Sequence, residues 1–322
     1  MIKRLILPVG LLAALAGALA FPGAGLWLAG HRTTSGIIAA VFLINGYQTE
    51  LSSFVLSKRL AGAFVIAALV SFVGGGILGK ILVSLLPFDR EIAMGILVMS
   101  TMAPTLSSVI VITRESGGNS PWAILMTVGL NLLAIFAIPL LLTLLLSGSS
   151  VSLPVGSLLG GLILNVLAPF VVGVALRRAI RRAPSAGVNL LPTLLVIALS
   201  YMSFCSGRRT LMESSLYTLA LLTASLLAMH LAMFALAVGL SFLFGYRTPE
   251  RKAISFLSSQ KTLPTAIGIL ASLGYAGGAA ALPCVMFHFT QILVDSFIAG
   301  IWRSRIASPD IGLQAIPEPE ES

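Results

Sequence analysis

Charged residues are scarce in this sequence: they make up 10% of the 322 residues, and only 11 residues are acidic. A soluble domain carries about a quarter charged residues, so this chain has too few ionic groups to cover a water-facing surface. Its two cysteines, Cys205 and Cys284, lie in apolar runs and imply neither a disulfide framework nor a metal site. The enzyme motifs HExxH and GxSxG are missing, and we expect no enzyme activity and no cofactor.

Apolar residues are abundant instead, at 57% of the chain with a mean hydropathy of +1.02. A membrane-spanning helix needs roughly 20 mainly apolar residues. The sequence therefore predicts an all-α membrane protein of ten transmembrane helices joined by short loops, in one transmembrane domain. The predicted spans are Leu5–Phe21, Ser35–Gln48, Leu60–Leu86, Glu91–Thr113, Pro121–Leu146, Leu153–Leu176, Asn189–Cys205, Ser215–Phe244, Lys252–Leu273 and Ala279–Trp302.

The distribution of the 20 lysines and arginines predicts the orientation. Fourteen of them fall at one set of span ends and five at the other, while Lys261 lies inside a span. Cytoplasmic loops of membrane proteins carry an excess of basic residues, so we expect a multi-pass protein of the cell (plasma) membrane with both termini in the cytoplasm. Because this charge sits in short loops between apolar runs, we expect a lipid bilayer as its partner and no nucleic acid.

The two chain ends allow further expectations. Lys3 and Arg4, an apolar run and the small residues before position 21 also fit a cleavable signal peptide over residues 1–20, although the charge distribution favours a retained first span. Residues 307–322 are rich in proline and acids, which predicts a disordered cytoplasmic tail. The oligomeric state is not indicated by the sequence.

Two predicted spans contain a proline surrounded by hydroxyl and amide side chains. Residues 100–108 read STMAPTLSS and residues 258–265 read SSQKTLPT. Pro104 and Pro264 are 160 positions apart, about half of the chain. Matching breaks in the two halves are typical of transporters built from inverted repeats. The sequence therefore predicts two five-helix repeats, over about residues 1–147 and 152–306, that cross the bilayer in opposite directions.

The physics of these breaks predicts a binding site. Proline removes a backbone donor and clashes with the preceding turn, and interrupted backbone at membrane depth is tolerated only within protein or beside a wet cavity. Half-helix ends then offer partial charges, and hydroxyl and amide groups add donors and acceptors. The alternative is a pair of proline kinks stabilised by neighbouring helices, with no ligand. The candidate crossover residues are Pro104, Thr105, Gln260, Lys261, Thr262, Pro264 and Thr265.

Further polar residues lie inside other predicted spans. His288, Gln291 and Asp295 follow one another at spacings of three and four, so they share one helix face. A polar face in a membrane helix should face the bundle interior, and we expect it beside the crossover. Asn45 could face the substrate from another side. His230 stands alone in its span, and we assign it a packing role.

The motifs APTLSS, GGN and SSQKTLP, in stretches Arg90–Leu142 and Arg251–Trp302, resemble the bile acid:sodium symporter superfamily, more narrowly its SBF-like branch of solute symporters. The resemblance implies a panel of spans 1, 2, 6 and 7, and a core of spans 3–5 and 8–10 in which the discontinuous helices 4 and 9 cross. By position it implies a sodium site. The matching residues are Ser107, Ser108, Thr127, Asn131 and Gln260.

The chain departs from that sodium-driven pattern. Val109 stands where the family pattern has an asparagine after the two serines. The position of the expected acidic ligand falls around Phe256–Leu257, which are apolar residues. The position of the glutamine expected in span 3 falls near Ala68, where this chain has no glutamine. These losses put sodium binding in doubt. We hypothesise that the Lys261 ammonium takes the place of the ion, held by half-helix carbonyls and Asp295, or that Lys261 carries a proton; the alternative is a purely structural lysine.

Together these features predict a secondary active transporter of a small organic, anionic solute, working by alternating access and coupled to sodium or protons. Two alternatives remain open. One is a sodium-independent, proton-coupled exchanger that uses Lys261, and the other is a non-transporting membrane regulator with the same fold.

Overall fold

The computed structural model describes residues 2–31, 33–49, 57–147, 154–180, 183–275 and 279–307, and every regular element in these ranges is a helix. Of the predicted tail over 307–322, all but Ala307, the last residue of α16, lies outside the described residues. The helices are α1 (Ile2–Ala20), α2 (Pro22–Gly30), α3 (Thr33–Gln48), α4 (Lys58–Ala68), η1 (Leu69–Gly74), α5 (Gly75–Leu85), α6 (Arg90–Ser100), α7 (Ser108–Glu115), α8 (Ser120–Leu145), α9 (Val155–Leu162), η2 (Ile163–Leu167), α10 (Ala168–Ile180), α11 (Ala186–Ser206), α12 (Arg208–Glu213), α13 (Leu216–Leu243), α14 (Thr248–Ser259), α15 (Leu263–Ser272) and α16 (Ala281–Ala307).

The length and composition of the helices make this a multi-pass membrane protein. Six helical stretches of the described chain are long and apolar enough to cross a membrane, and a seventh counts if Val9–Ala20 and Pro22–Gly30, bent by 97°, form one span. The other predicted spans are shorter: α3 has 16 residues, and two spans are divided into half-helices of 8 to 12 residues. The ten-span count therefore stays a prediction.

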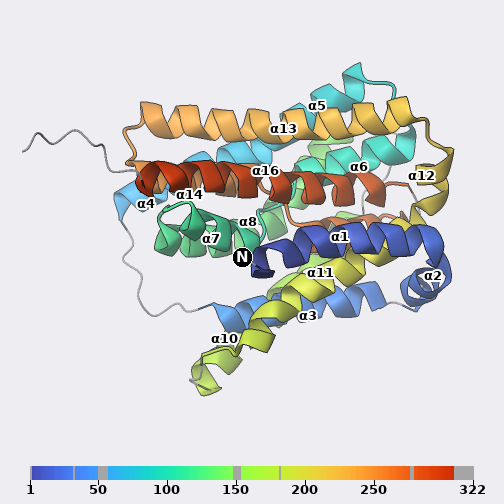
Figure 1. The fold of residues 1–322 in the computed structure, drawn as a ribbon, viewed down its shortest axis with the longest axis horizontal. Coiled ribbons are helices and arrows are strands. Elements are labelled where there is room, and N and C mark those ends of the chain that lie inside the picture. The colour runs from blue at the N-terminus through green and yellow to red at the C-terminus, as the bar shows by residue number, and fades with distance from the viewer. Residues whose placement is uncertain are drawn as a thin grey trace, which may run out of the picture.

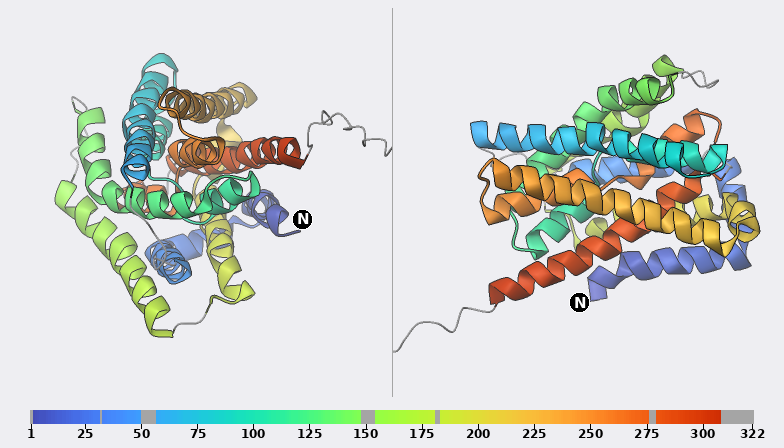
Figure 2. Two further views of the ribbon diagram at one scale, coloured as in Figure 1. Left: turned by 90° about the vertical axis from the view of Figure 1, so that its left-hand side faces the viewer. Right: turned by 90° about the horizontal axis from the view of Figure 1, so that it is seen from above.

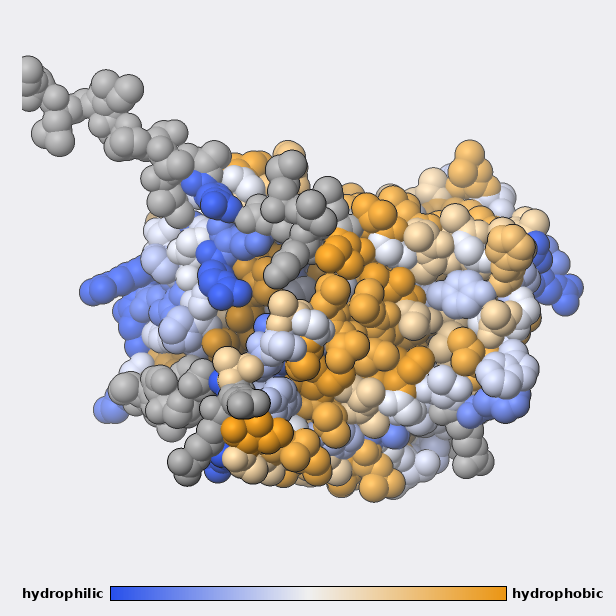
Figure 3. Space-filling view, turned by 60° about the horizontal axis from the view of Figure 1, so that its bottom comes forward, coloured by the Kyte–Doolittle hydropathy of each residue, from blue (hydrophilic) through white to orange (hydrophobic). Residues whose placement is uncertain are grey.

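The surface has the polarity that a bilayer demands. Figure 3 shows a broad apolar band between two ends where hydrophilic residues gather. Large apolar side chains in the long helices are exposed, among them Phe136 at 68% and Leu164 at 70%. A soluble monomer rarely exposes such a continuous apolar surface, so this band faces lipid.

The helices pack in two groups. In the first, α1 packs along α11 and α3 along α10, and α11 also contacts α3. The crossing of α3 and α10 is close, because a Cβ added to Gly46 would lie 2.2 Å from the Phe170 carbonyl oxygen. Small residues permit this kind of backbone approach in membrane helices. These helices run side by side along one flank of the molecule (Figures 1 and 2).

The second group contains α4 to α8 and α13 to α16. Here α13 packs on both α14 and α16, α16 packs on α6, and α14 contacts α4 and α8. The long helices α13 and α16 cover the shorter ones in the view of Figure 1. The two interrupted spans, α6 with α7 and α14 with α15, lie in this group. At the breaks the ends of α6, α14 and α15 are buried, and the start of α7 is half-buried.

The breaks lie where the sequence predicts them. Helix α6 ends at Ser100 and α7 begins at Ser108, with Pro104 in the non-helical segment between them. Helix α14 ends at Ser259 and α15 begins at Leu263, so Pro264 lies in the first turn of α15. Proline is favoured there, because the N–H that it lacks would have no partner within the helix.

A second irregularity faces these breaks. The helical stretch Lys58–Leu85 contains the π-helical turn η1 between α4 and α5. Such turns widen the helix and are common at functional sites. Gly75 follows η1, and a Cβ there would lie 2.4 Å from the Ser100 carbonyl oxygen and 3.0 Å from Lys261 Nζ. The absence of a side chain at Gly75 therefore leaves room for the end of α6 and for the lysine.

Candidate functional site

The two helix breaks meet in the interior of the second group. The backbone N–H of Thr262 donates to the carbonyl oxygen of Ala103 at 2.8 Å, which joins one non-helical segment directly to the other. Because both segments lack helical partners at these positions, this bond satisfies a donor and an acceptor that would be costly to bury alone. The contact fixes the crossing point around which the polar side chains are arranged.

Gln260 links the crossing to the start of α7. Its Oε1 accepts from Thr105 Oγ1 at 2.5 Å and from Ser108 Oγ at 3.3 Å. Thr105 Oγ1 also accepts from the Val109 N–H at 3.2 Å, so it caps the first turn of α7. Three predicted site residues therefore form one oxygen-rich cluster, in which Thr105 and Gln260 are buried and Ser108 is half-buried.

The other end of Gln260 reaches α16. Its Nε2 donates to Asp295 Oδ2 at 2.7 Å, and Asp295 Oδ1 lies 2.9 Å from His230 Nε2 on α13. His230 Nδ1 in turn lies 3.2 Å from the Ser259 carbonyl oxygen at the end of α14. His230 is thus part of the polar network, and the packing role that we assigned to it from the sequence was incomplete.

Lys261 is fully buried among acceptors of other helices. Its Nζ donates to the Ser71 carbonyl oxygen of η1, to Ser71 Oγ at 3.0 Å and to the Met102 carbonyl oxygen at 2.9 Å. An ammonium has three N–H donors and no acceptor, so these contacts match its capacity. The Met102 contact agrees with the hypothesis that carbonyl oxygens at a helix break hold the Lys261 ammonium. Asp295, the other expected partner, is instead bonded to His230 and Gln260.

The backbone of Lys261 is held from α16. Gln291 Oε1 accepts from the Lys261 N–H at 2.7 Å, and Gln291 Nε2 donates to the Lys261 carbonyl oxygen at 2.8 Å. The same Nε2 lies 2.9 Å from His288 Nδ1, while His288 Nε2 is buried without a hydrogen-bond partner in the described residues. The polar face predicted for α16 therefore lies against the crossing. There Gln291 bonds the backbone N–H and carbonyl oxygen of Lys261, which lies between two helices.

The residues that the resemblance assigned to a sodium site do not all converge. Ser108 and Gln260 share the cluster with Thr105. Asn131 Nδ2 instead donates to the Pro104 carbonyl oxygen at 3.1 Å, and Thr127 Oγ1 donates to its own helix at the Ala123 carbonyl oxygen. Ser107 precedes the first residue of α7, and its side chain makes no capping bond there. Their role in ion binding stays a prediction.

Three further candidates lie beside the crossing, and a fourth lies in the other helix group. Pro264 and Thr265 are buried in the first turn of α15, and Thr265 Oγ1 has no hydrogen-bond partner in the described part of the chain. Thr262 contributes its backbone bond to Ala103. Asn45 is buried on α3 in the other helix group, which contacts α15. The assignment of Asn45 to substrate stays a prediction.

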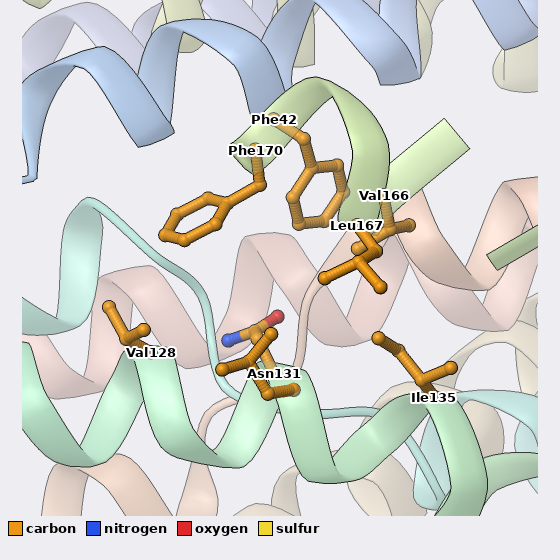
Figure 4. Close-up of a pocket in the computed structure, with 8 residues that line it drawn as sticks. Phe42, Val128, Asn131, Ile135, Val166, Leu167 and Phe170 are labelled. Atoms are coloured by element: carbon orange, nitrogen blue, oxygen red, sulfur yellow. The ribbon is translucent and has the colours of Figure 1, made fainter. Parts of the chain in front are cut away.

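A small cavity lies between the two groups. Its free volume is only about 10 Å³, about what one water molecule needs, and it is lined by side chains of α3, α8, η2 and α10. Figure 4 shows the aromatic rings of Phe42 and Phe170 on one side and Asn131 on the other. Asn131 is also bonded to the break at Pro104, so the cavity adjoins the crossing. Its lining is otherwise apolar: Val128, Leu132, Ile135, Val166 and Leu167.

Sequence reasoning missed two residues of the polar network at the crossing, Ser71 and His230. Ser71 lies in an apolar stretch with no distinguishing motif, and its contact depends on the π-helical turn. His230 could have been found, because a buried acid within a membrane needs a partner. His230 and His288 are the histidines inside the predicted spans.

Long apolar helices around a buried polar crossing of two broken helices define a multi-pass membrane transport protein. The comparisons with known proteins show to which family it belongs. The chain belongs to the SBF-like CPA transporter family, whose family model matches residues 3–304. This agrees with the resemblance drawn from the motifs.

Curated relatives extend the match over most of the chain. The probable sodium/metabolite cotransporter BASS4, chloroplastic, of Oryza sativa subsp. indica is 28% identical over 321 residues, covering 93% of this chain and 75% of the relative. Sodium/bile acid cotransporter 7 of Xenopus tropicalis is 27% identical over 302 residues, covering 88% of this chain and 86% of the relative. The mouse (Mus musculus) protein of that name is 28% identical over 296 residues, covering 86% and 85%. The family and these relatives are transporters and not enzymes.

Proposed function

We propose that this protein is a secondary active transporter that moves a small organic anion across the cell membrane by alternating access. The observation that carries the proposal is the meeting of two broken helices at the Thr262–Ala103 backbone bond, with Thr105, Ser108 and Gln260 gathered beside it. Broken helices that meet within the bundle give a transporter both a polar binding site and a point about which its parts can move. The sodium cotransport named for the relatives supports the same class of function.

The proposed architecture has ten spans in two inverted repeats of five. The panel consists of α1, α3, the stretch from α9 to α10, and α11, and the core contains the remaining spans. The separate packing of α3 on α10 and α13 on α14 supports this division. The basic ends of the helices support a topology with both termini in the cytoplasm.

The cavity between the groups supports the substrate class. Its aromatic and aliphatic walls fit the apolar part of a small organic molecule, and Asn131 offers a polar contact beside the break. A free volume of about 10 Å³ is far below the usual range of ligand pockets, so the cavity must widen when the panel and the core separate. The bile acid named for the Xenopus and mouse relatives is an organic anion, which supports an anionic substrate.

Either sodium or a proton would serve as the coupling ion. The names of the relatives favour sodium. The contacts of Lys261 favour the second candidate, a sodium-independent exchanger in which this lysine carries the proton, because its Nζ occupies the acceptors of η1 and of the α6 break. A membrane regulator without transport activity is the outcome expected if no flux is found.

Uptake by proteoliposomes tests the proposal. The purified full-length protein would be reconstituted and supplied with radiolabelled monocarboxylates, dicarboxylates and one bile acid, under an inward sodium gradient, a pH gradient or neither. We expect saturable uptake of at least one anion, driven by one of the two gradients. Sodium-driven uptake would identify symport, whereas pH-driven uptake that ignores sodium would identify the exchanger.

A matched pair of variants shows whether uptake depends on the crossing. Gln260→Leu removes the bonds to Thr105, Ser108 and Asp295, and should lower the uptake rate about tenfold or more, because each 1.4 kcal/mol corresponds to a factor of ten. Gln48→Leu removes a glutamine that bonds the Val188 carbonyl oxygen in the panel, and should leave the rate within about twofold. Equal rates in both variants, or no uptake of any anion by the wild type, would contradict the proposal.

A further inference from the structure

We propose that His230 and Asp295 together form a proton-binding site, and that the proton on this pair sets the geometry of the helix crossing. The use of this proton in transport rests on the proposed function, whereas its binding does not. The pair joins α13 to α16 at the end of α14 and lies apart from Lys261, which is bonded to Ser71 and Met102.

The hydrogen bonds of His230 require a proton at this contact. A carbonyl oxygen only accepts, so Nδ1, at 3.2 Å from the Ser259 carbonyl oxygen, must carry a hydrogen. A neutral imidazole with its hydrogen on Nδ1 has a lone pair on Nε2. That lone pair would then face Asp295 Oδ1 at 2.9 Å. The contact is favourable only when one more proton lies on either Nε2 or the carboxyl group.

The surroundings of the pair retain that proton in the observed conformation. The side chains of His230 and Asp295 are 1% and 0% exposed. The His230 ring packs edge-on against Phe287 at 5.9 Å between centroids and lies 6.5 Å from the Phe234 ring. Phe234 packs further against Trp302. The proton can therefore exchange with water only when these helices separate, and occlusion of this kind is required for coupled transport.

Both residues of the pair are hydrogen-bonded to the crossing. Asp295 Oδ2 accepts from Gln260, whose Oε1 accepts from Thr105. His230 is bonded to Ser259, the last residue of α14. Loss of the proton leaves either Nε2 opposed to the carboxylate or Nδ1 opposed to the Ser259 carbonyl oxygen. In both cases a contact at the end of α14 becomes unfavourable, so deprotonation favours a rearranged crossing.

Other titratable groups on the elements packed against α13 and α16 are engaged elsewhere. Lys58, Arg114 and Arg303 are exposed at helix ends. Those with partners of their own are Lys261 with Ser71 and Met102, His288 with Gln291, Cys284 with the Gly95 carbonyl, Lys252 with the Ser116 carbonyl, Lys80 with the Leu145 carbonyl, Tyr201 with the Phe21 carbonyl, Arg251 with Thr248, Arg59 with Glu250, and Glu91 with the Ala279 N–H. Arg90 and Glu115 also have partners. His230 therefore supplies the one ring that directly contacts Asp295 in the described chain.

The substitution Asp295→Asn distinguishes a proton-binding site from a structural ion pair. The asparagine amide can donate to His230 Nε2 while its oxygen accepts from Gln260, so it reproduces the protonated pair with a neutral imidazole. The variant should fold as well as the wild type at acidic pH. A structural ion pair would instead lose stability at every pH, because removing one partner leaves a buried charge uncompensated.

Thermal unfolding of the full-length protein in detergent, between about pH 5 and about pH 8, measures proton binding without any substrate. We expect the melting temperature of the wild type to fall as the pH rises, because the pair loses its proton. This slope should be lost in Asp295→Asn. It should persist in His31→Gln, which removes an exposed histidine at the end of α2, away from the crossing. A wild-type slope in Asp295→Asn, or a lower melting temperature of that variant at every pH, would overturn the inference.

The uptake assay then tests the use of the proton. Asp295→Asn should abolish uptake driven by a pH gradient, whereas His31→Gln should retain the wild-type pH profile. Uptake driven by a pH gradient that survives in Asp295→Asn would assign the proton to Lys261 and overturn the coupling role of the pair. Wild-type uptake that is driven by sodium alone and does not change with pH would overturn this coupling role and leave the transport function intact. If the wild type transports none of the anions, the proposed function fails, while the melting data still decide whether the pair binds a proton.

Discussion

At the scale of single residues, the arrangement around Lys261 shows how a buried lysine is accommodated without a carboxylate. Burial of a charge in a membrane is costly unless polar groups replace water. Here the Lys261 ammonium has three acceptors, two on η1 and one in the break after α6, and Gln291 holds its backbone at both the N–H and the carbonyl oxygen. The lysine thus joins η1, α6 and α16 at the crossing.

Removing this ammonium should destabilise the protein. Lys261→Met leaves the carbonyl oxygens of Ser71 and Met102 buried without their donor, at a cost of about 1–3 kcal/mol for each group. Thermal unfolding in detergent should show a clearly lower melting temperature. The exposed Lys80, which bonds the Leu145 carbonyl oxygen, provides the control, and Lys80→Met should change stability by less than about 0.5 kcal/mol. Equal stability of the two variants would show that Lys261 makes no net contribution.

At the scale of secondary structure, the crossing depends on irregular segments that fit one another. The two breaks supply Ala103 and Thr262 for a backbone bond, and the π-helical turn η1 supplies the Ser71 carbonyl oxygen. The close approach of α5 to the end of α6 is possible because Gly75 has no side chain. Each irregular segment leaves backbone groups without helical partners, and the segments satisfy these groups in one another.

A methyl group at Gly75 tests this fit. In Gly75→Ala the new Cβ would lie 2.4 Å from the Ser100 carbonyl oxygen, so α5 and α6 must move apart. We expect a loss of about 1–3 kcal/mol in stability, together with weaker uptake. Gly239→Ala in α13 is the matched control, because a Cβ there meets no atom within 4 Å and alanine is the better helix former. The prediction fails if Gly75→Ala is as stable as Gly239→Ala.

At the scale of the whole molecule, the two helix groups must move against each other if alternating access is correct. They meet at several places, among them the contacts of α16 with α11 and of α15 with α3 and with α9. In that region a Cβ added to Gly161 would lie 3.7 Å from Ser272 Oγ. This separation is within reach of a disulfide between two introduced cysteines.

A reversible cross-link at this place should stop transport. The double substitution Gly161→Cys and Ser272→Cys, treated with a mild oxidant in proteoliposomes, should lose most of its uptake, and a reductant should restore it. The single substitutions under the same treatment are the controls, since the native Cys205 and Cys284 are buried. Full uptake by the cross-linked protein would contradict a movement between panel and core at this position.

The sequence by itself determined the class of structure and the location of its breaks. Composition required lipid-facing helices, and the span boundaries follow the described helices closely, because apolar length and loop polarity are local properties. Pro104 and Pro264 marked both interruptions because each lies within a run of hydroxyl and amide side chains. Pro139 and Pro192, which lie in apolar runs, are instead inside the continuous helices α8 and α11. The spacing of His288, Gln291 and Asp295 likewise predicted a shared face from helix geometry alone.

Only the tertiary structure decided which polar groups meet. Asp295 was expected beside Lys261, but it lies against His230, 65 positions away in the chain, and Lys261 is bonded to Ser71, 190 positions away. Such pairings depend on helix rotation and on a π-helical turn, neither of which leaves a signal in an apolar run. An unpaired polar group is costly in a membrane interior, so the sequence shows which groups need a partner and the packing determines which partner each receives.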